Sequence, residues 1–238
     1  MKKGGRLAEE IAKQIRKALL SSELRAGDRL PPERDLARVF GTSPLVVREA
    51  LHTLEFDGLL HIRNGAAGGA IVIEPSHRPV TRSLTSWLRF GRATLEQLTE
   101  ARLLIEPEVA RLAALRAVRK DFEAFDAVLV ERRAAVKPGA PGQLLDIQFH
   151  RAVAEAAKNP VHLVVVHALM DLEAEAVIPA LVLSADDNTQ VLRAHERILE
   201  AIRRGEAARA QSLMTKHIRD VQRRLKDVEA HLRQNSLR

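Results

Sequence analysis

The first 75 residues place their apolar positions in two different patterns. In three segments apolar residues recur every three or four positions, which is the spacing of one face of an α-helix. These segments are residues 6–21, 31–40 and 44–56. Two short strand-like runs follow, residues 59–63 and 70–74, on either side of a glycine-rich segment. Short helices joined by a tight glycine turn, with a strand hairpin behind them, predict a winged helix-turn-helix.

The third predicted helix has a clear beginning and a predicted role. Ser43 can cap it, and Pro44 suits its first turn because proline has no N–H to leave unpaired there. In a helix-turn-helix the first residues of this helix meet base edges in the major groove. We therefore expect Ser43, Pro44, Leu45 and Arg48 to face DNA, with Arg34 on the preceding helix contacting the DNA backbone.

After a short linker, residues 76–80, every segment has helical spacing. The predicted helices are residues 81–90, 95–118, 120–136, 143–158, 160–178, 188–204 and 206–232. Such a series, punctuated by proline and glycine, predicts an all-α antiparallel bundle. The fold class is thus mainly α, with a DNA-binding domain over residues 1–75 and a helical domain for metal or effector binding and dimerisation over residues 81–238.

Four ionisable residues of the helical domain fall on apolar helix faces, where burial is costly. Asp146 and His150 are four apart and point the same way from one helix. His195 and His217 each interrupt the apolar stripe of another helix. A single inward histidine is usually satisfied by one hydrogen bond within the core. Three of them with a carboxylate at helical spacing predict a metal site instead.

The composition narrows the choice of ligands and metals. The chain contains no cysteine, so a bound ion must rely on imidazole and carboxylate groups. Three imidazoles and one carboxylate suit one divalent ion per chain. We expect zinc. Nickel, iron and manganese are alternatives, because ligand type does not select among these metals.

Charge and apolar content indicate the partner and the compartment. The formal net charge of +7 favours an anionic partner such as nucleic acid. Aromatic residues make up only 3% of the chain and tyrosine is absent, which argues against stacking on single strands and favours double-stranded DNA. No segment approaches the roughly 18 apolar residues that a membrane span needs. We expect a cytoplasmic protein without a membrane partner.

The sequence of the first domain resembles the GntR family of bacterial regulators. The likeness is carried by Leu30-Pro31-Pro32-Glu33-Arg34-Asp35-Leu36-Ala37, Val47-Arg48-Glu49-Ala50-Leu51, and Leu54-Glu55 followed by Gly58-Leu59. The resemblance implies a homodimer that reads a near-palindromic operator, with Arg34 and Arg48 contacting bases or phosphates and Asn64-Gly65 at the wing tip in the minor groove. One position departs from the family: Pro44 stands where members usually carry an arginine, so operator preference cannot be borrowed from relatives.

The helical domain resembles the FCD domain of the FadR branch of that family. The motifs that carry this resemblance are Glu100-x-Arg102-x-x-x-Glu106, Asp146-x-x-Phe149-His150, Asn159-Pro160, His195-x-x-Ile198 and Met214-x-x-His217. In metal-binding members an aspartate and three histidines at these places hold the ion. The resemblance also offers Arg102 as the partner of an effector carboxylate. An inward guanidinium needs an anion, and Glu106, one turn further on, is the equal alternative.

Together these features predict a ligand-responsive transcription regulator, a repressor as most relatives are, that holds a metal ion and binds a small organic acid. A direct metal sensor is the first alternative. A metal-dependent enzyme acting on a small carboxylate is the second, but no general base accompanies the ligands and the DNA-binding domain would be unexplained. We therefore expect no enzymatic activity.

Overall fold

The computed structural model describes residues 3–63, 68–74, 76–135, 142–176 and 184–235. The chain divides into two compact units, Met1–Pro79 and Val80–Arg238. Each unit has its own cluster of buried apolar side chains, and the two clusters share no member among the described residues. The units are therefore described one at a time.

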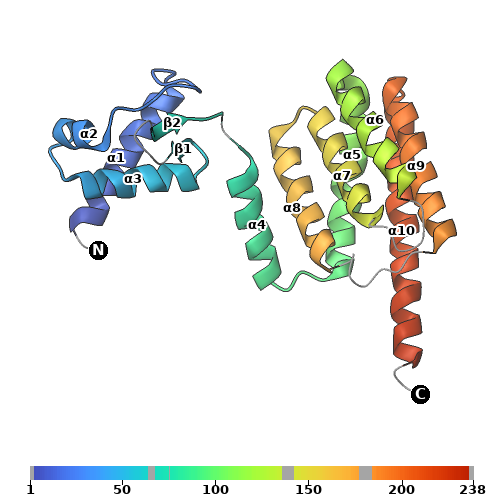
Figure 1. The fold of residues 1–238 in the computed structure, drawn as a ribbon. Helices are drawn as coiled ribbons and strands as arrows, with labels where there is room; N and C mark the ends of the chain where they lie inside the picture. The colour runs from blue at the N-terminus through green and yellow to red at the C-terminus, as the bar shows by residue number, and fades with distance from the viewer. Residues whose placement is uncertain (1–2, 64–67, 75, 136–141, 177–183, 236–238) are drawn as a thin grey trace. The chain divides into compact units, whose positions relative to one another are not determined.

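The first unit consists of three helices and a two-stranded sheet (Figure 1). Its elements are α1 (Lys3–Leu20), α2 (Glu33–Val39), α3 (Pro44–Phe56), β1 (Leu60–Arg63) and β2 (Gly69–Val72). The strands pair antiparallel, with Leu60 opposite Val72 and Arg63 opposite Gly69. The apolar face of α3 packs on α1, which buries Val47, Ala50, Leu51 and Leu54 against Ala8, Ile11 and Ile15. This is the predicted winged helix-turn-helix, but the predicted wing-tip residues Asn64 and Gly65 lie outside the described residues.

Local chemistry fixes where α3 begins. Gly41 has a φ of 59°, a left-handed conformation that glycine adopts without steric cost, and it closes the turn after α2. The Ser43 hydroxyl accepts a hydrogen bond from the Val46 amide at 3.4 Å, and Pro44 occupies the first turn. The predicted cap and first-turn proline of this helix are both present. The start of α3 is thereby held in place before any DNA is bound.

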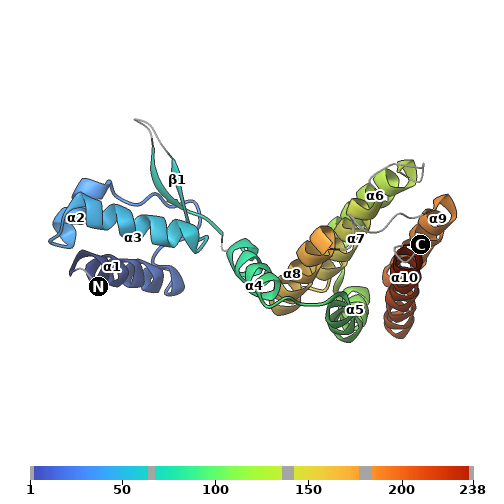
Figure 2. The ribbon, with the colours of Figure 1, turned by 90° about the horizontal axis from the view of Figure 1, so that it is seen from below.

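The second unit is an antiparallel helical bundle (Figures 1 and 2). Its helices are α4 (Arg78–Phe90), α5 (Leu95–Arg116), α6 (Arg119–Ala134), α7 (Gly142–Ala156), α8 (Pro160–Ala176), α9 (Ala185–Arg203) and α10 (Ala207–Asn235). Figure 2 shows α9 and α10 side by side, and α5 packs along α10. The core includes Phe125, Phe149, Met170, Ile198, Ile202, Met214 and Ile218. Within this unit α4 is joined to α8 by an Arg89–Glu175 ion pair.

The mainly helical fold class predicted from the sequence is confirmed, and the helices differ from their predicted bounds only by a few residues at the ends. One such difference is at α9, which begins at Ala185 instead of residue 188 because Ser184 caps it. The Ser184 hydroxyl accepts from the Asp187 amide at 3.1 Å, a local hydrogen bond that apolar spacing does not report. No helix in the described part of the chain is long and apolar enough to cross a membrane.

Candidate metal centre and DNA-reading surface

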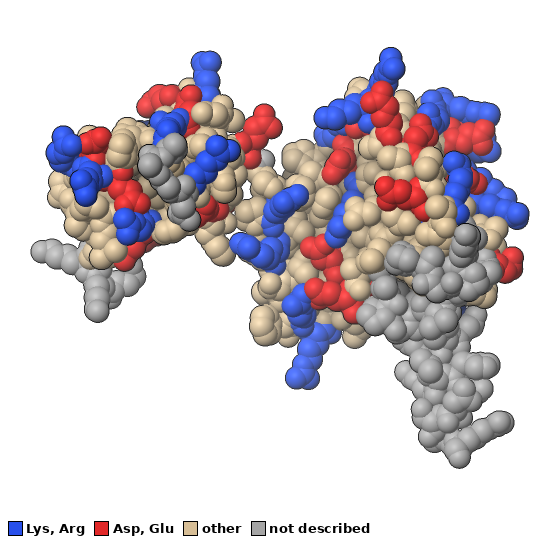
Figure 3. Space-filling view, in the orientation of Figure 1, with Lys and Arg blue, Asp and Glu red and all other residues tan. Residues whose placement is uncertain are grey.

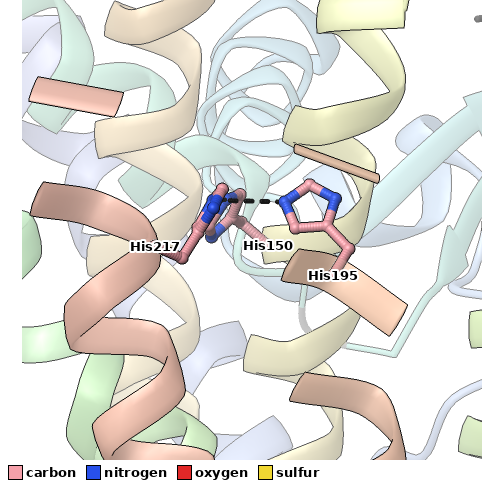
Figure 4. Close-up of side chains that lie close together, drawn as sticks. All are labelled: His150, His195 and His217. Carbon is pink, nitrogen blue, oxygen red and sulfur yellow. Dashed lines mark hydrogen bonds between the residues drawn. The ribbon is translucent and has the colours of Figure 1, made fainter. Parts of the chain in front are cut away.

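Three histidines from three helices meet inside the second unit. His150 comes from α7, His195 from α9 and His217 from α10, and all three are buried (Figure 4). The Phe149 ring stacks on His195 with the ring centroids 4.0 Å apart, so the cluster is walled by aromatic surface. Sequence spacing predicted these three positions as inward-facing. The structure brings them together.

The imidazoles approach each other through their Nε2 atoms. Nε2 of His217 lies 3.2 Å from Nε2 of His150 and 3.2 Å from Nε2 of His195. A neutral imidazole nitrogen offers a single in-plane position, either an N–H or a lone pair. His217 Nε2 therefore satisfies at most one of its two neighbours by hydrogen bonding. At least one of the other two Nε2 atoms therefore receives no hydrogen bond from His217, and its lone pair is available to a cation at the centre.

Carboxylates lie behind two of these rings. Nδ1 of His150 forms an ion-pair contact with Glu106, and Nδ1 of His195 lies 3.6 Å from the Asp146 carboxylate. A proton on Nδ1 then faces a carboxylate and leaves a lone pair on Nε2. This is the order of groups found at metal-bound histidines, where an outer carboxylate orients the ring and makes it more basic. In His150 the Nε2 atom also lies 3.4 Å from Nη2 of Arg102.

Burial keeps two of the imidazoles neutral. Removal from water lowers the pKa of His195 well below its ordinary value, and neighbouring His217 and His150 add to the effect. Burial, followed by the charge of His150, likewise lowers the pKa of His217. The neutral imidazole is the form that binds a metal ion, because the ion needs the lone pair that a proton would occupy.

The cluster has the dimensions of a metal site. Zinc–nitrogen bonds of about 2.0–2.1 Å at a tetrahedral angle place two ligand nitrogens roughly 3.3–3.4 Å apart. The two observed Nε2 separations of 3.2 Å are close to this value, and the candidate ligand atoms of all three histidines lie within 4.8 Å of one another. The residues present therefore fit a divalent ion.

Asp146, the fourth predicted ligand, lies beside the cluster and is held by an arginine. Nε of Arg132, on α6, donates to Oδ1 of Asp146 at 2.6 Å, and the same guanidinium donates to the side-chain oxygen of Asn188 at 3.0 Å. Burial raises the pKa of Asp146, although Arg132 opposes this effect. The carboxylate thus stands on the Nδ1 side of His195, away from the three Nε2 atoms.

Arg102, the predicted effector contact, is fully engaged within the protein. Its Nε donates to Glu106 at 2.5 Å, and its Nη1 lies 2.5 Å from Glu173 on α8. Burial alone would raise the pKa of Glu106, but Arg102 and His150 lower it below its ordinary range. Of the two partners left open by the sequence, the contacts favour the internal carboxylate.

Sequence reasoning missed two members of this network. Glu173 and Arg132 are absent from the predicted site because each lies on its own helix, far along the chain from its partner. A charged residue at a buried position of a helix is the only sequence signal that either carries.

The residues of the first unit that are predicted to face DNA lie on its surface. Arg34, Ser43, Pro44, Leu45 and Arg48 are all exposed. On the face drawn in Figure 3, basic and acidic side chains alternate over both units, so charge alone does not mark one surface. The predicted reading surface therefore rests on the position of Ser43, Pro44, Leu45 and Arg48 at the start of α3, with Arg34 on α2, and not on a basic patch.

Arg48 has a partner that the sequence did not reveal. Its Nε and Nη2 donate to the Glu33 carboxylate on α2, at 3.1 and 2.7 Å. A bidentate pair of this kind fixes the plane of the guanidinium. Glu33 on α2 therefore fixes the orientation of the Arg48 guanidinium near the start of α3.

Comparison with known proteins identifies both units. Residues 7–68 match the family model described as bacterial regulatory proteins, gntR family, and residues 97–220 match the FCD domain. The Uxu operon transcriptional regulator of Escherichia coli is 32% identical over 91% of this chain and 86% of its own length. The HTH-type transcriptional regulator LutR of Bacillus subtilis is 31% identical over 85% of this chain and 93% of its own.

A solved structure agrees with these relatives. Streptococcus agalactiae GntR superimposes with a TM-score of 0.65 at 26% identity, and the match covers 91% of this chain and 99% of that one. Because the family and these relatives are transcriptional regulators, the enzyme alternative is excluded. The chain belongs to the GntR family of bacterial regulatory proteins and joins that family's DNA-binding domain to an FCD effector-binding domain.

Proposed function

We propose that this GntR-family regulator is a homodimeric repressor that holds one divalent metal ion per chain and leaves its operator when a small organic acid binds. The observation that carries the metal proposal is the convergence of three buried imidazole Nε2 atoms, two of their separations being 3.2 Å. A bound ion supplies positive charge and open coordination positions to a carboxylate. Zinc is the proposed metal, with nickel, iron or manganese as alternatives.

The proposed ligands are His150, His195 and His217 through Nε2, with Asp146 as the fourth. A carboxylate has about four lone-pair sites, so Asp146 can serve a cation without leaving Arg132 entirely. Because Asp146 faces Nδ1 of His195 and not the three Nε2 atoms, this role requires its side chain to turn toward the ion. The effector is proposed to act by favouring one of two states of the dimer, and coupling of this kind is on the order of 1–3 kcal/mol.

The operator is proposed to be a near-palindromic DNA duplex read by two copies of α3. Dimeric helix-turn-helix proteins match their own two-fold symmetry to two half-sites about one helical turn apart. Arg34 and Arg48 are the proposed contacts from α2 and α3. Asn64 and Gly65 are the proposed minor-groove contacts.

Replacing Arg48 with alanine should weaken binding to a DNA duplex selected from a random library by about 1–3 kcal/mol. The variant loses a guanidinium that Glu33 orients through Nε and Nη2, which leaves the donors of Nη1 for DNA. Fluorescence anisotropy at fixed salt measures the change. The matched control is Arg119→Ala, which removes an exposed arginine paired with Glu123 in the helical unit. Equal losses in the two variants would show a general charge effect and contradict the assignment of α3.

Leu45 should read thymine methyl groups. Its side chain is 63% exposed beside Pro44 at the start of α3, where the family usually offers an arginine. Apolar side chains in the major groove contact the thymine 5-methyl. Uracil in place of the thymine facing Leu45 removes only that methyl group, and we expect a loss of about 0.8 kcal/mol, or roughly fourfold in affinity.

A scan of single thymine-to-uracil changes across the selected duplex locates this base. The Leu45→Ala variant should be insensitive at the same base while keeping its sensitivity elsewhere. If both proteins lose the same affinity there, Leu45 does not read that base.

A further inference from the structure

A groove between α9 and α10 opens beside the imidazole cluster. It encloses about 180 Å³, and its lining includes Arg193 and Arg197 from α9 and Lys216, His217, Asp220 and Arg224 from α10. His217 belongs both to this lining and to the three-histidine cluster. The groove is therefore a route from the protein surface to one imidazole of the candidate metal centre.

The lining of the groove is strongly basic. Arg193, Arg197, Lys216 and Arg224 face a single acidic residue, Asp220. Lys216 lies 3.3 Å from Asp220, and Arg224 is paired with Asp187 at 3.2 Å. Within the part of the chain that the structure describes, the side chains of Arg193 and Arg197 are exposed and form no ion pair or hydrogen bond. The groove thus holds two guanidinium groups that have no anion.

Arg193 and Arg197 are four residues apart on α9 and so lie on the same face of the helix, one turn apart. Guanidinium groups bind carboxylate and phosphate through two parallel hydrogen bonds. The pair can therefore hold two anionic groups of one molecule, or one doubly charged group. A molecule with a single carboxylate would leave half of this capacity unused.

Arg102, inside the bundle, lacks such capacity. Arg102 already has two carboxylates, Glu106 and Glu173, within 2.5 Å. A further anion there would have to displace one of them or share one guanidinium with both. The basic groove carries the opposite excess of charge, so an anion entering the unit is attracted to the groove and not to Arg102.

We propose that the α9–α10 groove is the docking site of a compact dianion, a dicarboxylate or a phosphorylated small molecule, held by Arg193 and Arg197 with His217 at its inner end. That this groove is an effector site rests on the proposed function. Binding of the dianion to the groove does not itself require the metal. The cavity volume of about 180 Å³ is below the roughly 300–1,000 Å³ of pockets for drug-sized ligands, so the occupant is a small molecule.

The test compares three probes on the metal-loaded full-length protein: succinate, glucose 6-phosphate and, as the single-carboxylate comparison, acetate. Titration calorimetry at constant ionic strength measures each affinity. The test variant is Arg193→Gln/Arg197→Gln. The control is Arg219→Gln, which removes an exposed arginine of α10 that does not line this groove. Metal analysis after dialysis is run on every protein.

We expect at least one of the two dianions to bind more tightly than acetate. Its affinity should fall by at least about tenfold in the double variant and less than about twofold in the control, because charge-assisted hydrogen bonds are lost only in the former. Preference for succinate assigns the groove to a dicarboxylate, and preference for glucose 6-phosphate assigns it to a phosphate. Metal content should be the same in all three proteins.

Two results would contradict the proposal that the groove binds a dianion. One is a wild-type protein that binds neither dianion better than acetate. The other is dianion binding that survives in the double variant but is lost in an Arg102→Gln protein that circular dichroism shows to be folded, which would place the effector in the interior and leave the proposed function standing. Conversely, arginine-dependent binding in a protein that retains no metal would support the groove and reject the metal part of the proposed function.

Discussion

Replacing Arg102 with methionine is expected to lower the free energy of unfolding of the helical unit by about 3–5 kcal/mol. The substitution preserves much of the apolar stem but leaves the carboxylates of Glu106 and Glu173 without their guanidinium. Glu106 is nearly inaccessible to water, so its charge has no alternative source of stabilisation. Urea unfolding followed by circular dichroism measures the change.

The same variant should show a characteristic pH dependence. In the unmodified protein the pKa of Glu106 is below its ordinary value, so the stability it provides is present above about pH 4.3 and is lost as the pH falls further. Without Arg102, burial raises the pKa of this carboxyl, and protonation relieves the cost. The difference between the two proteins should therefore shrink between pH 7 and pH 4.

Arg119→Met is the control for Arg102→Met. The Arg119–Glu123 pair is exposed, and exposed pairs contribute at most about 1 kcal/mol. A loss of less than 1 kcal/mol for Arg102→Met, constant over this pH range, would contradict the view that Arg102 neutralises the buried carboxylates. It would also favour a role in holding an external anion.

The second large effect is expected at His217, whose Nε2 contacts both other imidazoles. His217→Ala should reduce zinc affinity by more than about 100-fold, because loss of an outer partner of a ligand alone costs about 10–100-fold. Titration calorimetry and metal analysis after dialysis against zinc measure it. His217→Asn, which leaves a smaller void, distinguishes loss of the ligand from loss of the fold.

His61→Ala is the matched control, since His61 is an exposed histidine on β1 in the other unit. Both His217 variants should keep their affinity for the selected DNA duplex in the absence of effector. Full zinc occupancy in a folded His217→Asn protein would rule out the proposed ligand set.

The sequence was sufficient for the architecture because the architecture depends on local, repeating features. Apolar residues at helical spacing predicted the helices of both units, and the Ser43-Pro44 pair predicted the start of α3 from hydrogen-bond chemistry within three residues. The three histidines were predicted by the same reasoning, since a residue on an apolar stripe points into the bundle whatever its neighbours are.

The partners of the charged groups could not be predicted in this way. Glu33 contacts Arg48 from 15 positions away, and Arg132 on α6 holds Asp146 on α7. Periodicity reports which face of a helix is buried but not which face of another helix meets it. The pairing of Arg102 with Glu106 could be anticipated because they are one turn apart, whereas Glu173 approaches from a different helix.

The two apolar clusters described above have a consequence for how this protein can change over time. No buried residue among those described is common to both clusters, so a substitution in one core leaves the packing of the other intact. Energetic effects at such separate sites are close to additive. Under the proposed assignments, variation at Leu45 would redirect the regulator to other promoters without changing its sensing specificity. Variation at Arg193 or Arg197 would change the sensed compound while the target genes remain the same.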